Sequence, residues 1–322
     1  MVNGKKLFVS ASPHIRSKDT TRGIMLDVII SLIPAFIASV IIFGYRSILV
    51  TGVSIISCVL SEYLIRKFVL KRHSTIGDLS AVVTGLILAL NLPSGIEIWM
   101  VIVAAVFAIV IVKQCFGGIG QNFVNPAIAA RIFLLLSFGK MMEWTEPLAG
   151  FTKCEALTGA TPLVSDELPT LTEMFLGIRG GSMGETCILA LIIGGIYLVA
   201  RRVISPAIPL SFILTVGVLS FIREGFDVTG ALYQIMSGGL FLGAIFMATD
   251  YTTSPIRTSG KIIYGIGCGL VTCLIRFYGN LPEGVSYSII LMNVLTPLIE
   301  KATTPKPFGT PKKEKKAKEG AK

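Results

Sequence analysis

The chain contains the stretch Gly85-Leu-Ile-Leu-Ala-Leu-Asn-Leu-Pro93, an apolar run that ends at an asparagine and a proline. A second run of the same kind, Gly243-Ala-Ile-Phe-Met-Ala-Thr-Asp250, is followed by Pro255. Both runs predict interrupted helices, because proline and polar residues do not continue an apolar helix. Interrupted helices at matching positions are typical of membrane proteins built from two inverted repeats, where unwound backbone lines a cavity or is buried in protein. The alternative is a chance similarity between two apolar segments.

The composition of the whole chain is that of an integral membrane protein. Of its 322 residues, 52% are hydrophobic and only 15% are charged, with a mean hydropathy of +0.76. About 25% of the residues of an average soluble domain are charged. The apolar residues occur in runs of roughly 20, the length that spans a bilayer as a helix.

Ten apolar segments, some of them short, are predicted to cross the membrane. The predicted fold is therefore an all-α polytopic membrane protein with about ten transmembrane helices in two inverted five-helix repeats with broken helices. Five spans per half is an odd number, so the two halves have opposite orientations. The predicted spans are 24–43, 48–65, 79–92, 96–113, 122–138, 185–200, 206–223, 230–249, 262–278 and 285–300.

These spans divide the chain into five regions. An amino-terminal segment and a Lys-rich tail flank two transmembrane repeats, and a long polar loop separates the repeats. The tail has almost no apolar residues to bury and is predicted to be disordered. The regions are 1–23, 24–138 (first repeat), 139–184 (loop), 185–300 (second repeat) and 301–322 (tail).

The placement of basic residues predicts the orientation of the chain. With the amino terminus inside the cell, 22 of the 29 lysines and arginines lie in cytoplasmic segments, six lie outside, and Arg131 lies within a span. Cytoplasmic segments of membrane proteins carry such an excess of basic residues. Both termini are therefore predicted to be cytoplasmic, and residues 139–184 to be extracytoplasmic, in a multi-pass membrane protein.

Several kinds of chemistry are not indicated by the sequence. There are two histidines and six scattered cysteines without a C-x-x-C pair, so neither a metal site nor an iron–sulfur cluster is predicted in this chain. No P-loop, dinucleotide fingerprint or nucleophile elbow is present, and no catalytic residue is predicted. The net charge of +10 is explained by topology and by contact of the tail with lipid headgroups, so nucleic acid is not an expected partner.

Polar residues in and beside the fifth span are candidate ligands of a cofactor. Asn122 and Asn125 lie at the start of this span, and Arg131 lies in its middle. We assign the three to a polar lining. Arg131 has two interpretations, since an arginine at this depth can bind a phosphate or a polar cofactor edge, or can pair with a carboxylate on a neighbouring helix.

The extracytoplasmic loop contains the motif Thr158-Gly-Ala-Thr161, followed by Pro162. Gly159 and Ala160 leave space around the hydroxyl of Thr161, and the following proline biases Thr161 toward an extended backbone. On its own the motif is short enough to be an ordinary turn.

Five separated motifs together are similar to the family of the D subunit of the Rnf electron-transport complex, and more distantly to the B subunit of the sodium-pumping NADH:quinone reductase. The resemblance extends over nearly all of the membrane part. The motifs are Thr158-Gly-Ala-Thr-Pro-Leu163, Gly117-Gly-Ile-Gly-Gln-Asn-Phe-Val-Asn-Pro-Ala127, Met247-Ala-Thr-Asp-Tyr-Thr-Thr-Ser-Pro255, Tyr278-Gly-Asn-Leu-Pro-Glu-Gly-Val-Ser-Tyr287 and Leu291-Met-Asn-Val-Leu-Thr-Pro297.

The resemblance implies that Thr161 carries FMN through a phosphoester bond, attached outside the cytoplasm by a dedicated flavin transferase, with Thr158, Gly159 and Ala160 as the attachment motif. The family usually has an aspartate six residues before this threonine, where this chain has Glu155, so a carboxylate is retained. Relatives are also thought to hold a non-covalent riboflavin in the membrane domain. Iron–sulfur clusters, the nucleotide site and a second covalent FMN would then belong to partner subunits.

The function that the resemblance implies is that of a flavin-carrying subunit, not catalytic alone, of an ion-translocating ferredoxin:NAD oxidoreductase. This complex would couple electron transfer to outward movement of Na⁺ or H⁺, and the sequence does not say which ion. The alternative is a channel or secondary transporter of the urea-transporter type without a redox role, because an inverted five-plus-five pattern fits that class too.

Overall fold

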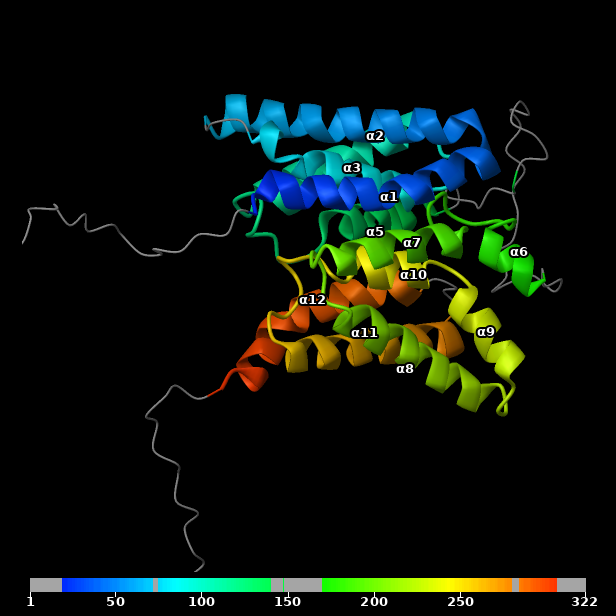
Figure 1. The fold of residues 1–322 in the computed structure, drawn as a ribbon. Coiled ribbons are helices and arrows are strands. Elements are labelled where there is room, and N and C mark those ends of the chain that lie inside the picture. The colour runs from blue at the N-terminus through cyan, green and yellow to red at the C-terminus, as the bar shows by residue number, and fades with distance from the viewer. Residues whose placement is uncertain (1–18, 72–74, 140–146, 148–169, 280–283, 306–322) are drawn as a thin grey trace, which may run out of the picture.

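The computed structural model describes residues 19–71, 75–139, 147, 170–279 and 284–305, and the elements within these ranges are helices (Figure 1). The helices are α1 (Thr21–Phe43), α2 (Tyr45–Leu64), η1 (Ile65–Val69), η2 (Ile76–Asp78), α3 (Ser80–Leu90), α4 (Ile98–Val106), η3 (Phe107–Gln114), α5 (Pro126–Phe138), α6 (Leu171–Leu176), α7 (Ile188–Ala200), α8 (Ala207–Arg223), α9 (Val228–Met236), α10 (Leu240–Leu242), η5 (Gly243–Met247), α11 (Thr258–Tyr278) and α12 (Gly284–Thr303).

A helical segment lies at each of the ten predicted spans, so the all-helical prediction is confirmed for the described residues. Three helical segments are long and apolar enough to cross a membrane alone: Thr21–Phe43, Tyr45–Val69 and Thr258–Tyr278. A fourth candidate is the pair Val228–Met236 and Leu240–Met247, which is bent by 64°. Five further apolar helices have only 10–17 residues. The chain is thus a helical protein with several membrane spans, while ten crossings in two inverted repeats remain a prediction.

The helices form one bundle in which the two halves of the sequence meet along their inner helices (Figure 1). In the first half α2 packs on α3 and α4, and in the second half α11 packs on α8 and α12. Contacts of α1 with α7 and of α5 with α12 join the halves. The start of α1 and the end of α12 lie on the same side of the molecule, and α6 lies on the opposite side (Figure 1).

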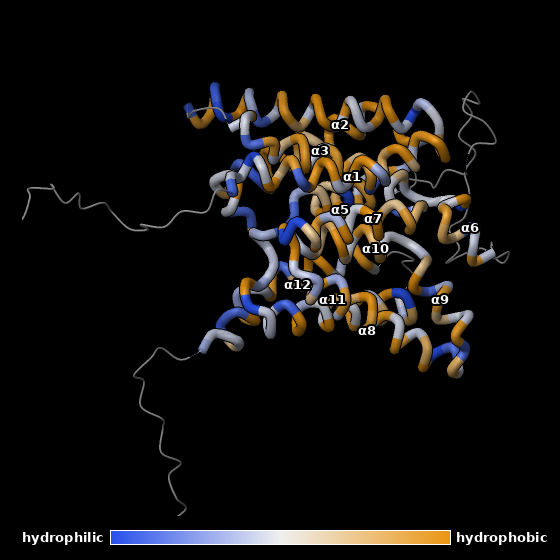
Figure 2. Tube along the Cα trace, in the orientation of Figure 1, coloured by the Kyte–Doolittle hydropathy of each residue, from blue (hydrophilic) through white to orange (hydrophobic). Residues whose placement is uncertain are grey.

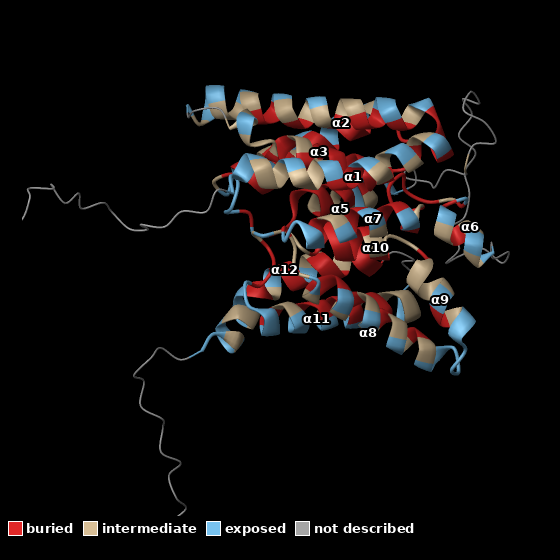
Figure 3. Ribbon diagram, viewed as in Figure 1, coloured by how far each residue is buried: buried red, intermediate tan, exposed pale blue. Residues whose placement is uncertain are grey.

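The outward faces of the helices are apolar, which is the reverse of a soluble protein. Figure 2 shows the helices as mainly apolar along their middle, and Figure 3 places exposed positions on their outer faces. Ile41 of α1 is 71% exposed, Ile56 of α2 is 66% exposed and Leu214 of α8 is 63% exposed. Side chains of this kind are stable at a surface only if lipid or protein covers them.

Both predicted helices are interrupted, and the backbone at the first interruption is hydrogen-bonded. Helix α3 ends at Leu90, and the carbonyl oxygens of Leu90 and Leu92 accept hydrogen bonds from Gly184 N (2.7 Å) and Met183 N (3.0 Å). The second interruption lies before the quoted run, between α9 and α10, where Gly238 has a φ of 63°. Gly238 allows this turn because glycine adopts a left-handed backbone conformation without steric cost.

Gly194 of α7 lies at a close contact between the two halves, against the backbone of α1. A Cβ at this position would lie 2.2 Å from the carbonyl oxygen of Ser31 on α1 and 2.9 Å from Cζ of Phe246. We therefore expect Gly194→Ala to lower the free energy of unfolding by about 1–3 kcal/mol, because the helices must separate. Thermal unfolding of the detergent-solubilised protein measures the effect.

The matched control is Gly52→Ala in α2, where a Cβ would meet no atom within 4 Å. Alanine is favoured over glycine inside a helix by about 0.5–1 kcal/mol, so this variant should be as stable as the parent or more so. Equal unfolding temperatures for the two variants would contradict the close contact at Gly194.

Candidate functional site

The predicted flavin-attachment motif, Thr158, Gly159, Ala160 and Thr161, lies outside the described residues. The described chain leaves the bundle at the end of α5 and returns at α6, whose amino terminus has a capping box formed by Thr170 and Glu173. Thr170 Oγ1 accepts a hydrogen bond from Glu173 N, and Thr170 N donates to Glu173 Oε2. Helix α6 contacts α7 and α9 at the edge of the bundle.

A cavity of about 400 Å³ lies between the two halves of the sequence, and it is lined by α1, α3, α5, α7 and η5 together with the segments around residues 119–125 and 249–252. The volume is within the range of small-molecule sites. Its lining is mostly apolar, with a group of polar side chains. The apolar lining includes Ile24, Met25, Val28, Val83, Ile87, Leu198 and Phe246, and the polar lining includes Ser80, Thr84, Lys113, Asn122, Asn125, Thr249, Asp250 and Thr252.

Asn122 and Asn125, predicted as polar lining, are both at this cavity. Asn125 caps α5: its Oδ1 accepts from Ala127 N (3.0 Å), Pro126 occupies the first helical position, and its Nδ2 donates to Met247 O (3.2 Å). Asparagine followed by proline is a typical helix start, and here it also ties α5 to η5. Asn122 Nδ2 donates to Val124 O (3.0 Å) and lies within hydrogen-bonding reach of Asp250.

Asp250 supplies the carboxylate of the cavity. Its Oδ2 accepts hydrogen bonds from Thr252 Oγ1 (3.0 Å) and Thr253 Oγ1 (3.4 Å), which follow it in the sequence. The short spacing of Asp250, Thr252 and Thr253 explains why this motif forms a local hydrogen-bonded turn. The cavity therefore offers hydrogen-bond acceptors at Asp250 and amide groups at Asn122 and Asn125.

Arg131 is not part of the cavity lining. It is 2% exposed, its Nη1 donates to Asn91 Oδ1 (2.8 Å) and its Nη2 lies 3.9 Å from Glu185 Oε2. Asn91 stands at the end of α3, and Glu185 lies against Gly239 at the α9–α10 interruption. These contacts support the interpretation in which Arg131 pairs with a carboxylate. They also link the two interrupted helices.

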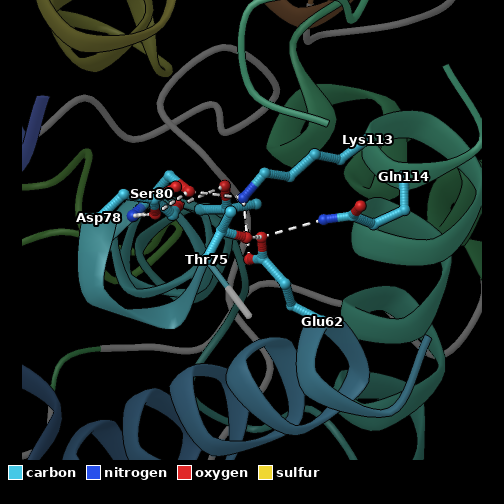
Figure 4. A network of polar contacts seen from close by, with 7 residues as sticks. Glu62, Thr75, Asp78, Ser80, Lys113 and Gln114 are labelled. Atoms are coloured by element: carbon cyan, nitrogen blue, oxygen red, sulfur yellow. Dashed lines mark hydrogen bonds and ion pairs between the residues drawn. The ribbon is translucent and has the colours of Figure 1, made fainter. Parts of the chain in front are cut away.

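A second buried ion pair, which the sequence did not bring together, lies beside the cavity (Figure 4). Lys113 Nζ is 2.9 Å from Glu62 Oε2, and both side chains are almost fully buried. Lys113 Nζ also donates to Ser80 Oγ (2.7 Å). Glu62 and Lys113 lie near the ends of two different predicted spans. Sequence spacing does not predict contacts between different helices, so this pair could not be predicted.

Among the described residues no group of three or more histidine, cysteine or acidic side chains is arranged to hold a metal ion. Cys58, Cys268 and Cys273 are buried within the bundle. Burial raises the free-energy cost of forming a thiolate, so these cysteines are packing residues.

Comparison with known proteins identifies relatives along nearly the whole chain. The family model described as NQR2, RnfD, RnfE matches residues 8–309. A protein of Acetobacterium woodii, named as the D subunit of a Na⁺-translocating ferredoxin:NAD⁺ oxidoreductase complex, is 46% identical, and the match covers 98% of this chain and 100% of the relative. The D subunit of a complex of Clostridium ljungdahlii, named as a proton-translocating ferredoxin:NAD⁺ oxidoreductase, is 40% identical, covering 95% and 97%. The D subunit of a complex of Stutzerimonas stutzeri, named as an ion-translocating oxidoreductase, is 37% identical, covering 89% and 91%.

Proposed function

The chain belongs to the NQR2, RnfD, RnfE family, and from this membership we propose that it is the D subunit of an ion-translocating ferredoxin:NAD oxidoreductase complex. As one subunit of several it is not catalytic alone. Its partners are the other subunits of the complex, including those that carry iron–sulfur clusters and a second flavin. The observation that carries this proposal is the match over nearly the full length of relatives that are themselves named as the D subunits of such complexes.

The names of the relatives favour a redox-driven pump over the alternative of a urea-transporter-like channel. They differ in the ion, because one relative is named for Na⁺ and another for protons. The transported ion of this chain is therefore left open between Na⁺ and H⁺, both moving outward.

Thr161 carries FMN through a phosphoester bond in this proposal, attached by a flavin transferase outside the cytoplasm. Thr158, Gly159 and Ala160 form the recognition motif for attachment. The bond joins the hydroxyl oxygen of the threonine to the phosphate of FMN. When bound, a flavin supplies the ability to take up one or two electrons, as a relay between iron–sulfur centres and NAD requires.

The cavity fits a non-covalent riboflavin, which we propose as its ligand. A flavin has a flat, largely apolar ring system with a polar edge and a chain of hydroxyl groups. The cavity matches these parts with apolar walls from α1, α3, α7 and η5 and with a polar group that includes Asn122, Asn125 and Asp250. The apolar walls can pack against the ring system, and the carboxylate of Asp250 can accept hydrogen bonds from ligand hydroxyls. Arg131 lies outside this lining and pairs with Glu185, so it is not proposed as a contact of the ligand.

The proposed topology is that both termini are cytoplasmic, with ten spans in two inverted repeats over 24–138 and 185–300. The loop 139–184 is then extracytoplasmic, where the flavin transferase acts, and the 1–23 segment and 301–322 tail face the cytoplasm. The excess of basic residues in the segments assigned to the cytoplasm supports this arrangement. An even number of spans also agrees with α1 beginning and α12 ending on one side of the molecule (Figure 1).

Membrane vesicles from cells with and without this chain test the proposed function. We expect loss of ferredoxin-dependent NAD reduction and of ion accumulation when the chain is absent, because electrons can no longer pass through the complex, and recovery of both when it is supplied from a plasmid. The transported ion is then identified with two reagents. Accumulation that is stopped by an Na⁺ ionophore indicates Na⁺, and accumulation that is stopped by a protonophore indicates H⁺. Retention of both activities without the chain, or solute conduction by the chain alone in liposomes, would contradict the proposal.

A further inference from the structure

Lys113 is a cation on the wall of the cavity, and its surroundings fix it in place. Its side chain is 4% exposed, and it lies in η3, at the point where this helix meets α2 and α3. A protonated lysine has three N–H groups. Glu62 Oε2 accepts from Nζ at 2.9 Å and Ser80 Oγ accepts at 2.7 Å (Figure 4).

The two acceptors of Lys113 are themselves held by further contacts, so the lysine cannot turn away. Glu62 Oε1 accepts from Thr75 Oγ1 (2.7 Å) and Gln114 Nε2 (2.9 Å). Ser80 Oγ donates to Asp78 Oδ1 (2.6 Å), which leaves its lone pairs to Lys113. Four segments of the chain therefore contribute to the position of one ammonium group (Figure 4).

Glu62 and Ser80 accept two of the three N–H groups of Lys113, which leaves one N–H for a ligand in the cavity. Both Lys113 and Ser80 line the cavity, whereas Glu62, Thr75 and Gln114 do not. The ion pair is thus arranged with the carboxylate behind and the ammonium at the wall. Because Glu62 balances its charge, Lys113 acts on a ligand chiefly as a strong hydrogen-bond donor and less as a net positive charge.

We propose that Lys113 is the donor that binds the carbonyl edge of the ring system of the ligand in this cavity, and that Glu62 is its positioning residue. The inference rests on the proposed function, in which the ligand is a riboflavin. Lysine is a donor only and so matches ring carbonyl oxygens, which are acceptors only, whereas Asp250 is an acceptor and matches the hydroxyl groups of the ribityl chain. The two residues would then fix the ligand's direction in the cavity.

The test uses the purified complex, depleted of non-covalent flavin, titrated with riboflavin while quenching of riboflavin fluorescence is followed. The main variant is Glu62→Gln with Lys113→Met, which removes both charges together and so leaves no unpaired buried charge. We expect its Kd for riboflavin to rise about ten- to a hundredfold, the effect of one lost hydrogen bond to a charged group. Lys113→Arg keeps a cationic donor and should lose less.

A second ligand distinguishes which part of the flavin Lys113 contacts. Lumichrome has the carbonyl edge of the ring system but no ribityl chain, so its Kd should rise by the same factor in the main variant. The matched control is Thr272→Val, which removes a buried hydrogen bond to Ser288 outside the cavity lining and should leave both affinities near those of the parent.

Three outcomes would overturn the inference. Unchanged riboflavin affinity in the main variant would show that Lys113 does not contact the ligand. Unchanged lumichrome affinity with weakened riboflavin binding would place Lys113 at the ribityl chain. An equal loss in Thr272→Val would show that the affinities follow the stability of the bundle and not a contact with Lys113. If the parent complex itself binds no riboflavin, then the ligand assigned under the proposed function fails too, and this result is distinct from the other three.

Discussion

Replacing Thr161 by valine is expected to abolish covalent flavin on this chain completely. Valine has nearly the same shape as threonine but lacks the hydroxyl oxygen that forms the phosphoester, so no bond can form whatever the fold of the loop. The measurement is flavin fluorescence of the denatured, gel-separated protein after co-expression with a flavin transferase, supported by the intact mass of the chain. The loss should be all or none, because attachment is covalent.

Thr152 provides the matched control for this experiment, because it lies in the same loop but outside the attachment motif. Thr152→Val should keep full fluorescence. Fluorescence that persists in the Thr161→Val variant would mean that another residue carries the flavin. Absence of flavin from the unmodified chain would remove the flavin-carrier proposal and would also remove a reason to place residues 139–184 outside the cytoplasm.

Replacing Arg131 by methionine is expected to lower the free energy of unfolding by about 3–5 kcal/mol, the usual cost of removing one partner from a buried ion pair. The variant removes one of the two buried arginines that interact with Glu185, which is 2% exposed, and it removes the hydrogen bond to Asn91. Since Asn91 and Glu185 adjoin the two helix interruptions, the loss of stability should be located where the two halves meet. Thermal unfolding of the detergent-solubilised protein measures it.

Two further variants separate this explanation from a general effect of losing an arginine. Arg131→Lys keeps a cation beside Glu185 and should therefore be more stable than Arg131→Met. Arg201 is 60% exposed and pairs with Asp27 at 3.3 Å, so Arg201→Met should cost less than about 1 kcal/mol. Equal unfolding temperatures for Arg131→Met and Arg201→Met would contradict a structural role for the buried pair.

The positions of the helices could be predicted from the sequence because they depend on local patterns. Apolar runs such as 24–43 and 206–223 end where charged or glycine-rich segments begin, and the structure has helices α1 and α8 there. Asn125 followed by Pro126 marked the start of α5 in the same way. The second interruption was predicted in the correct span, but its place at Gly238 was not, because pairs of glycines also occur where a helix continues, as at Gly194 and Gly195 of α7.

The candidate site could be predicted only in part. Asn122 and Asn125 were singled out as polar residues beside the fifth span, and both line the cavity. The sequence did not indicate that Lys113 and Asp250 share this cavity with the two asparagines. From the sequence, Arg131 could contact either a cofactor or a carboxylate. The structure shows that its polar partners include Asn91 and Glu185.

The sequence by itself determined that the chain is a helical membrane protein, where its helices lie, and which family its motifs resemble. These properties follow from hydropathy, charge placement and short motifs, each of which is read within a few adjacent residues. The tertiary structure alone decided which distant residues meet: Glu62 with Lys113, Arg131 with Asn91 and Glu185, and the cavity between the two halves. Such pairings depend on how helices pack, and burial in a low-dielectric interior requires every charge there to find a partner, whatever its distance along the chain.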